Sequence, residues 1–253
     1  MTYILILFLT YVLHLLLKLN WVCTAVVLVF LLVMQHFHRI KGQRFQEARK
    51  RFLDVSLYID TLLYSFLKEQ KIIRAFEDVK STLADGHMKE TVSRAIDHMM
   101  LTFDETEVFV DAMRIIEDEY KCNRIVNAHE FMAHAEYYGG DIKESARILL
   151  KDKSAWERRI LRNIEDRQRM FHQIILSVVT SVIISGIILY LPVLSMDISS
   201  NIIVQILSAA LIVLDDLIIL WGQKFLEVDY LGIDLLPEDD KHAKKLDEYK
   251  AYN

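Results

Sequence analysis

Three apolar blocks constrain the fold of this sequence more than any other feature. They comprise residues 4–37, 174–193 and 202–221, and each is too hydrophobic to form the surface of a water-soluble protein. A helix that crosses the hydrocarbon core of a bilayer needs about 20 apolar residues, which is the length of the second and third blocks. We therefore predict that residues 174–222 form a C-terminal pair of membrane-spanning helices.

The first block is longer and contains a polar break at residues 18–20 (KLN). As one straight helix it would measure about 50 Å, whereas the hydrocarbon core is only ~30 Å thick. We therefore expect residues 1–38 to form an N-terminal transmembrane hairpin with a short first arm, which brings the number of spans to four. No basic segment precedes the block and no small-residue cleavage site follows it, so the hairpin is interpreted as an uncleaved anchor.

Basic residues flank the apolar blocks on one side only. Lys and Arg are frequent between residues 39 and 51, and five arginines precede the second block, whereas the connection at residues 192–201 has neither. Lys and Arg accumulate in cytoplasmic loops. The distribution therefore predicts a multi-pass protein of the cytoplasmic (plasma or inner) membrane, with residues 39–173 and the tail at 223–253 on the cytoplasmic side.

Residues 39–173 show the spacing of amphipathic helices throughout. Apolar residues recur every three or four positions, a period that places them on one face of a helix. The whole chain holds only 7 Gly and 2 Pro, so few positions interrupt helices. We predict an all-α fold in which residues 39–173 form a six-helix antiparallel bundle. No helix breaker separates Glu144 from the second apolar block, so the sixth helix is expected to continue into the membrane.

The segment HEFMAH at residues 129–134 is similar to the His-Glu-x-x-His motif of zinc proteases. Its histidines, His129 and His134, are five positions apart instead of four. On a helix this spacing turns the two side chains ~140° apart, whereas a spacing of four leaves them ~40° apart. Both histidines are therefore interpreted as structural residues, and no metal site is predicted. An intramembrane metalloprotease that uses His129 and Glu130 is the alternative.

Asp215 and Asp216 lie inside the third apolar block. A charged side chain in the middle of a bilayer costs about 2.5–3.5 kcal/mol on insertion scales, so these carboxylates are not expected to face lipid. One interpretation is that they make polar contacts with the neighbouring span or lie close to the membrane interface. The candidate contacts on that span are Ser177, Thr180, Ser181 and Ser185. The alternative interpretation is a proton or ion site in a small ion-coupled transporter.

The five arginines before the second block are Arg158, Arg159, Arg162, Arg167 and Arg169. They form either a solvated face that interacts with anionic lipid headgroups or a docking surface for a cytoplasmic partner. The sequence has no glycine-rich phosphate loop, no paired nucleophile and base, and no Cys–His metal spacing. We therefore expect neither enzymatic activity nor a cofactor. The formal charge of −5 gives no indication of nucleic-acid binding.

The segment FMAHAEYYGGDIKESA at residues 131–146 is followed by Trp156-Glu-Arg-Arg and then by the apolar block that ends near Pro192. This order of a helix, a glycine turn, a short amphipathic helix and a basic helix that enters a span resembles the type II secretion system F domain family. Within that family the chain looks most similar to the single-domain, type IV pilus-like platform proteins of tight-adherence (Tad) pili. The resemblance covers residues 50–193.

The resemblance implies a non-enzymatic platform protein of a pilus or type II secretion-like assembly machine in a prokaryotic inner membrane. The implied protein partners are a cytoplasmic secretion ATPase, pilin or pseudopilin subunits, and a paralogous platform protein or a second copy of this chain. The ATPase would supply the energy, which is consistent with the lack of a nucleotide-binding motif in this sequence. Membrane lipids complete the expected partners.

Overall fold

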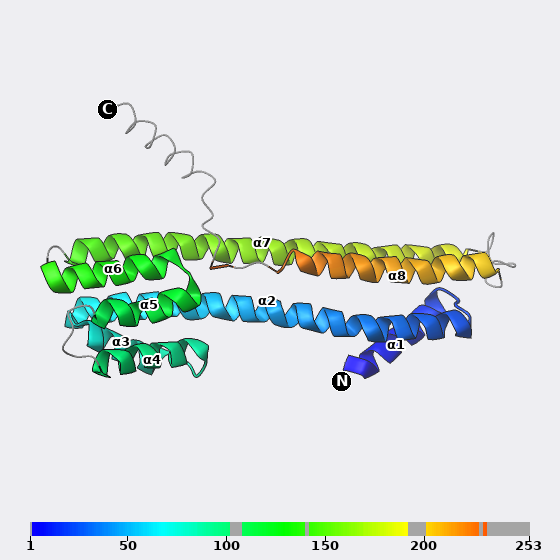
Figure 1. Cartoon of the computed structure of the whole chain (residues 1–253). Coiled ribbons are helices and arrows are strands. Elements are labelled where there is room, and N and C mark those ends of the chain that lie inside the picture. Colours follow the sequence, from blue (N-terminus) through cyan, green and yellow to red (C-terminus); the bar gives the residue numbers. More distant parts are fainter. Residues whose placement is uncertain (1, 102–107, 140–141, 192–200, 228–229, 232–253) are drawn as a thin grey trace, which may run out of the picture. The chain divides into compact units, whose positions relative to one another are not determined.

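The computed structural model describes residues 2–101, 108–139, 142–191, 201–227 and 230–231 of the chain. These residues form eight α-helices and no strand, which confirms the all-helical class (Figure 1). The helices are α1 (Thr2–Leu16), α2 (Trp21–Glu69), α3 (Ile72–Thr82), α4 (His87–Leu101), α5 (Val108–Tyr120), α6 (Asn123–Tyr138), α7 (Ile142–Tyr190) and α8 (Ile202–Lys224). The expected turn at Pro192 and most of the expected tail at 223–253 lie outside the described residues.

The chain divides into two compact units. The first comprises Met1–Arg49 and Arg158–Val228, and the second comprises Lys50–Glu157 and Asp229–Asn253. Helices α2 and α7 contribute residues to both units, and each is one uninterrupted helix. The lack of a helix breaker after Glu144 had predicted this continuity for α7.

Three of the described helices, α2, α7 and α8, are long and apolar enough to cross a membrane. Helix α1 is also apolar, but it has 15 residues. At 1.5 Å per residue it is about 22 Å long, which is shorter than the ~30 Å hydrocarbon core. The described residues therefore offer three candidate spans where the sequence suggested four, because α1 ends at Leu16 and a turn at residues 17–20 separates it from α2.

The turn between α1 and α2 is held by side chains from α7 and α8. Gln205 of α8 is buried, accepts a hydrogen bond from the backbone N–H of Asn20 at 2.7 Å and donates one to the carbonyl of Lys18 at 2.8 Å. The ammonium of Lys18 lies 4.2 Å from the ring centroid of Tyr190 on α7, and the hydroxyl of Tyr190 donates to the carbonyl of Leu15 at 2.6 Å. These contacts satisfy backbone groups that the end of α1 leaves unpaired.

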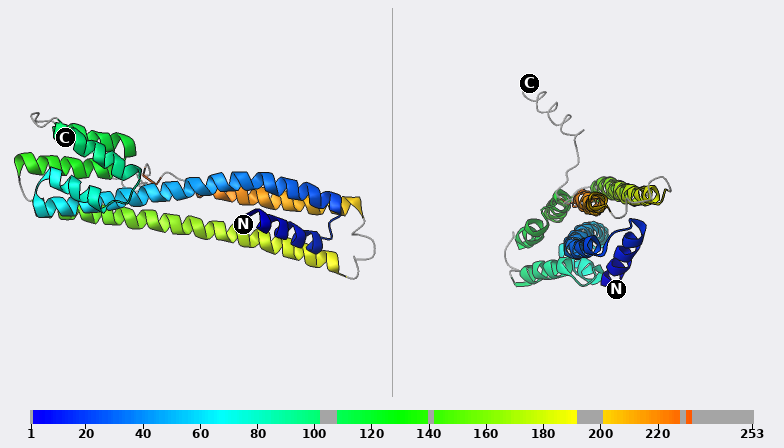
Figure 2. Two further views of the ribbon diagram at one scale, coloured as in Figure 1. Left: turned by 90° about the horizontal axis from the view of Figure 1, so that it is seen from below. Right: turned by 90° about the vertical axis from the view of Figure 1, so that its right-hand side faces the viewer.

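Helix α1 packs closely against α7, beside which it lies in Figure 2. The close approach depends on Gly186, because a Cβ atom at this position would lie 2.6 Å from the side chain of Leu16. Small residues allow helices in membranes to approach one another in this way. Next to this contact, Leu13, Leu17 and Ile212 belong to a buried apolar cluster that joins α1 to α8.

The second unit consists of α3, α4, α5, α6 and parts of α2 and α7. Its core is built from the apolar faces that the sequence period had marked. Large side chains that are buried in this core include Phe52, Leu62, Phe66, Phe76, Ile116, Met132 and Trp156. The charged side chain of Lys153 is also enclosed, at 2% exposure, and its ammonium lies 2.5 Å from a carboxylate oxygen of Asp60 and 2.8 Å from one of Glu157.

Two helix ends in this unit follow capping rules. Gly139 has a φ of 69°, and its N–H donates to the carbonyl of Ala135 at 3.1 Å, which ends α6 at Tyr138. Glycine is common just beyond the C-terminus of a helix, so the Gly139-Gly140 pair in the sequence is consistent with this end. At the start of α3, the N–H of Ile72 donates to the carboxylate of Glu136 at 2.9 Å, so one of the unpaired donors of the first turn is satisfied.

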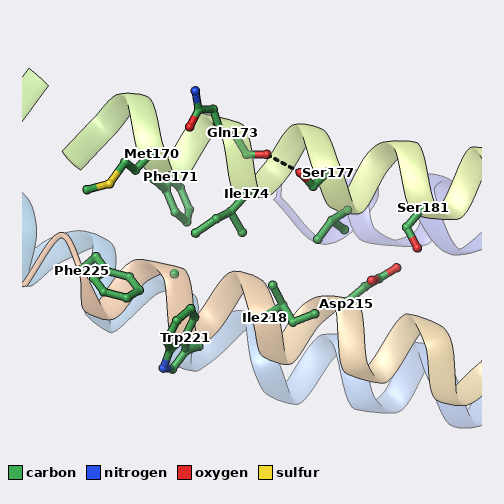
Figure 3. A pocket seen from close by; sticks show the side chains of 12 residues that line it. Met170, Phe171, Gln173, Ile174, Ser177, Ser181, Asp215, Ile218, Trp221 and Phe225 are labelled. Atoms are coloured by element: carbon green, nitrogen blue, oxygen red, sulfur yellow. Dashed lines mark hydrogen bonds between the residues drawn. The ribbon is translucent and has the colours of Figure 1, made fainter. Parts of the chain in front are cut away.

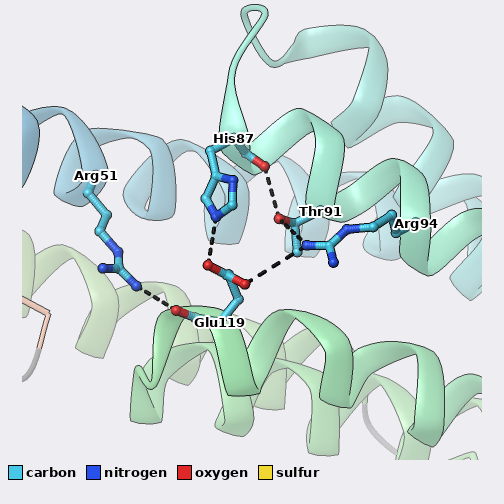
Figure 4. A network of polar contacts seen from close by, with 5 residues as sticks. All are labelled: Arg51, His87, Thr91, Arg94 and Glu119. Atoms are coloured by element: carbon cyan, nitrogen blue, oxygen red, sulfur yellow. Dashed lines mark hydrogen bonds and ion pairs between the residues drawn. The ribbon is translucent and has the colours of Figure 1, made fainter.

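An exposed polar network centred on Glu119 joins α2, α4 and α5 (Figure 4). Its carboxylate lies 2.6 Å from His87 and 3.9 Å from Arg94, and its backbone carbonyl accepts a hydrogen bond from Arg51 at 2.5 Å. The hydrogen bond with His87 lowers the pKa of the Glu119 carboxyl. Because these groups are exposed, their ion pairs contribute little to stability.

Candidate functional site

Asp215 and Asp216 are consecutive residues of α8, so their side chains point about 100° apart around the helix axis. Each carboxylate therefore has different neighbours. Both side chains are largely enclosed, and both keep a buried oxygen, Oδ2, without a hydrogen-bond partner.

Asp216 faces α2, where it meets a histidine that the sequence analysis had not singled out. Its Oδ1 lies 3.1 Å from Nε2 of His38, and Nδ1 of the same ring lies 3.0 Å from Oε1 of Gln223. The two side chains of the ion pair are 14% and 16% exposed. One turn beyond His38, the ammonium of Lys41 donates to the carbonyl of Leu220 at 3.1 Å. A row of polar contacts thus joins α2 to the second half of α8.

Asp215 faces α7 and lines an open groove between α7 and α8 (Figure 3). The groove has a volume of about 570 Å³ and is lined mostly by apolar side chains, among them Phe171, Ile174, Ile218, Trp221 and Phe225. Asp215 is 7% exposed and forms no hydrogen bond or ion pair with another residue of the described ranges. A smaller apolar cavity of about 260 Å³, which α1 also lines, reaches both carboxylates from another side.

None of the four serine and threonine side chains of α7 that were named as candidate partners forms a hydrogen bond with Asp215 or Asp216 in the described residues. The hydroxyl of Ser177 donates to the carbonyl of Gln173 at 3.0 Å, and that of Thr180 donates to the carbonyl of Leu176 at 2.8 Å. Ser181 lines the groove across from Asp215 (Figure 3). An unpaired carboxylate in such apolar surroundings is costly, by about 2.5–3.5 kcal/mol on insertion scales.

The five arginines lie on α7, upstream of its apolar part. Arg158, Arg162 and Arg169 are exposed, and Arg159 and Arg167 are partly buried. Arg167 has structural contacts, since it donates to the side chain of Asn163 at 2.5 Å and to the carbonyl of Phe225 at 2.7 Å. Arg167 thereby ties α7 to the end of α8, while the exposed arginines present their charges to solvent.

The HEFMAH segment places its three polar residues in different surroundings on α6. His129 is 1% exposed, and its ring nitrogens lie 2.6 Å from the hydroxyl of Tyr58 and 2.7 Å from the carboxylate of Glu117. Burial lowers the pKa of His129, although its contact with Glu117 acts in the opposite direction. His134 and Glu130 are both exposed.

Within the part of the chain that the structure describes, no group of three His, Cys, Asp or Glu side chains is arranged to hold a metal ion. The wide separation of His129 and His134 follows from their spacing of five on a regular helix. The side chains that make polar contacts with His129 come from α2 and α5.

The sequence did not point to His38, the partner of Asp216, or to Gln223, which contacts His38. His38 is 178 positions from Asp216, so no local pattern joins them. A partial signal existed, because both residues lie near the cytoplasmic end expected for their apolar blocks and therefore at similar membrane depth. Gln223 gave no separate signal, since it follows the last apolar block directly.

No protein-family profile matches the chain, and no curated protein or solved structure shows significant similarity to it.

Proposed function

We propose that this chain is a non-enzymatic platform protein of a pilus or type II secretion-like assembly machine in the cytoplasmic membrane of a prokaryote. The second unit is a six-helix cytoplasmic bundle in this proposal, and it meets a secretion ATPase. The apolar helices meet pilin or pseudopilin subunits, and a paralogous platform protein or a second copy of the chain completes the assembly.

The observation that carries the proposal is the continuity of α7. This helix has 49 residues, and Trp156, Ile160 and Ile164 of its first part are buried. Its last part is apolar enough to span a membrane. A single helix with both properties supports a protein that transmits motion from a soluble bundle to the membrane.

The acidic residues of α8 give less support to a transporter. Asp216 is already paired with His38, and Asp215 is the single charged residue among the described residues that line the groove. An ion pathway through a membrane is usually marked by several polar or ionisable groups along its length. The platform function therefore agrees better with the distribution of charge.

The test separates transmission along α7 from docking on it. Arg162→Pro removes a backbone hydrogen bond in the helix interior at a cost of about 3 kcal/mol or more. We expect this variant to co-purify with a secretion ATPase encoded beside the gene, yet to lose pilus or secretion output. Arg162→Ala should keep both, because alanine is a good helix former.

Docking is tested by reversing charge on one exposed face of α7. Arg158 and Arg162 are four positions apart and therefore adjacent on the helix. Arg158→Glu combined with Arg162→Glu should weaken ATPase co-purification in a salt-dependent manner. Lys71→Glu, at the residue before α3, combined with Arg74→Glu in α3 reverses the same number of exposed charges and serves as the matched control. If deletion of the whole gene leaves output intact, the platform function is excluded.

A further inference from the structure

The two carboxylates of α8 differ in one respect that points to a missing partner. His38 of the same chain meets Asp216 at 3.1 Å, whereas no residue of the described segments contacts the carboxylate of Asp215 with a hydrogen bond or ion pair. Asp215 is nevertheless 7% exposed and directed into the groove between α7 and α8 (Figure 3). The groove therefore contains one enclosed carboxylate that is free to bind a basic group of a ligand.

The dimensions of the groove favour a helix over a small ion. Its lining runs from Met170 to Ser181 on α7 and from Asp215 to Phe225 on α8. At 1.5 Å per residue, both stretches are about 15 Å long, which corresponds to roughly three helical turns. Ser177 is a small residue of this lining, and small residues allow another helix to approach closely.

The chemistry of the groove selects the kind of helix. Apolar lining residues suit the apolar side chains of a membrane-spanning segment, and a carboxylate in hydrocarbon is stabilised by a basic group. Four of the basic side chains near the apolar parts of this chain already have contacts within it. These contacts are His14 with Thr24, Lys18 with Tyr190, His38 with Asp216 and Lys41 with the carbonyl of Leu220.

We propose that the groove between α7 and α8 binds a membrane-spanning helix of a different protein, and that this helix presents a lysine or arginine side chain to Asp215. The carboxylate sets the depth at which the helix binds, and the apolar walls supply the contact area. This inference goes beyond the platform function, since it concerns lateral recognition inside the bilayer and requires neither an ATPase nor a pilus.

The experiment uses the full-length protein in lipid vesicles and designed peptides of about 20 Leu and Ala residues, the length of one span. One peptide carries a single lysine and its control carries leucine at the same position. Asp215 precedes Trp221 by six residues, so the lysine is placed about 9 Å from one end of the apolar segment. Both peptides contain a photoreactive leucine, and cross-linked sites are mapped by mass spectrometry.

We expect the lysine peptide to label residues 170–181 and 215–225 about tenfold more than the leucine peptide, which corresponds to about 1.4 kcal/mol. Polar contacts between designed membrane helices have this magnitude. Asp215→Asn keeps the size of the side chain and should reduce labelling to the level of the leucine peptide. Asp216→Asn is the matched control on the other face of α8 and should leave the preference intact.

Equal labelling by the two peptides would overturn the proposal, as would labelling outside the groove or an unchanged preference in Asp215→Asn. His36 on α2 is exposed, so a second copy of this chain is the other source of a basic group. Cross-links that join α2 of one copy to the groove of another, without labelling by the peptide, would show that the groove serves self-association. That result would also contradict the proposal of a different protein as the partner.

Discussion

His129 connects three helices of the second unit through its two ring nitrogens. Tyr58 of α2 and Glu117 of α5 lie within hydrogen-bonding distance of the ring. Burial raises the pKa of Tyr58 well above its ordinary value and lowers that of His129. A neutral imidazole accepts a hydrogen bond on one nitrogen and donates one from the other, which suits a tyrosine hydroxyl on one side and a carboxylate on the other.

The lowered pKa of His129 predicts how stability depends on pH. An unfolded histidine has a pKa of about 6.5, so below that pH the unfolded chain binds a proton that the folded chain excludes. The contribution of His129 to the free energy of unfolding should therefore be fully present above about pH 6.5. Below that pH the free energy of unfolding should decrease, by at most ~1.4 kcal/mol per pH unit. Thermal unfolding of the detergent-solubilised chain, followed by circular dichroism at several pH values, measures this dependence.

His129→Gln should reduce the decrease in stability at acidic pH. His134→Gln removes an exposed histidine from the same helix and should leave that decrease unchanged. An identical decrease in wild type and His129→Gln would assign the loss of stability to other groups.

At the scale of helices, contact between α1 and α7 rests on the absence of one side chain. Gly186 lies in the apolar part of α7, and a Cβ atom there would approach Leu16 to 2.6 Å. By contrast, an added Cβ at Gly42 in α2 would meet nothing within 4 Å. Glycine therefore allows close packing at position 186, whereas at position 42 it only lowers the stability of the helix.

Gly186→Ala should weaken the packing of α1 by about 1–3 kcal/mol, because overpacking forces Leu16 to move. Gly42→Ala should be neutral or stabilising by up to about 1 kcal/mol, since alanine favours helix formation. Thermal unfolding in detergent compares the two variants. Adding Leu16→Ala to Gly186→Ala should remove the overpacking, and a double variant no more stable than Gly186→Ala would argue against this contact.

The helices themselves could be predicted from the sequence, because their signals are local. The apolar period and the scarcity of Gly and Pro predicted an all-helical chain, and the pair Gly139-Gly140 indicated where α6 ends, although not which of the two glycines follows it. The pairing of Asp216 with His38 could not be predicted, since 178 residues separate them and no periodic pattern relates positions on different helices. Spacing predicted that His129 and His134 would diverge, but the identity of the buried partners Tyr58 and Glu117 depends on tertiary packing.

At the scale of the whole molecule, the distribution of charge predicts the orientation in the membrane. Basic residues concentrate after the first apolar block and before the second, which predicts that residues 39–173 lie in the cytoplasm. In the second unit, Ser81 is an exposed residue near the end of α3. Ser200 lies in the sequence between the second and third apolar blocks, where Lys and Arg are absent.

Cysteine labelling tests this orientation in a background that lacks Cys23 and Cys122. A membrane-impermeant maleimide should label Ser200→Cys in intact cells and leave Ser81→Cys unlabelled. Both should react after lysis, which confirms that each position is accessible. Labelling of Ser81→Cys from outside intact cells would contradict the proposed orientation. The second unit would then lie on the side of the membrane opposite to a cytoplasmic ATPase.

The contact between Asp216 and His38 also bears on the order in which the chain is built into a membrane. Ribosomes synthesise α2 long before α8, so His38 is in place when Asp216 emerges. In the proposed membrane arrangement, α8 would then carry a carboxylate into a bilayer that already holds its basic partner, which lowers the cost of inserting it. Exchanging the two positions along the chain would present the acidic helix first, without that partner. In that arrangement, the order of the helices in the gene would assist membrane insertion.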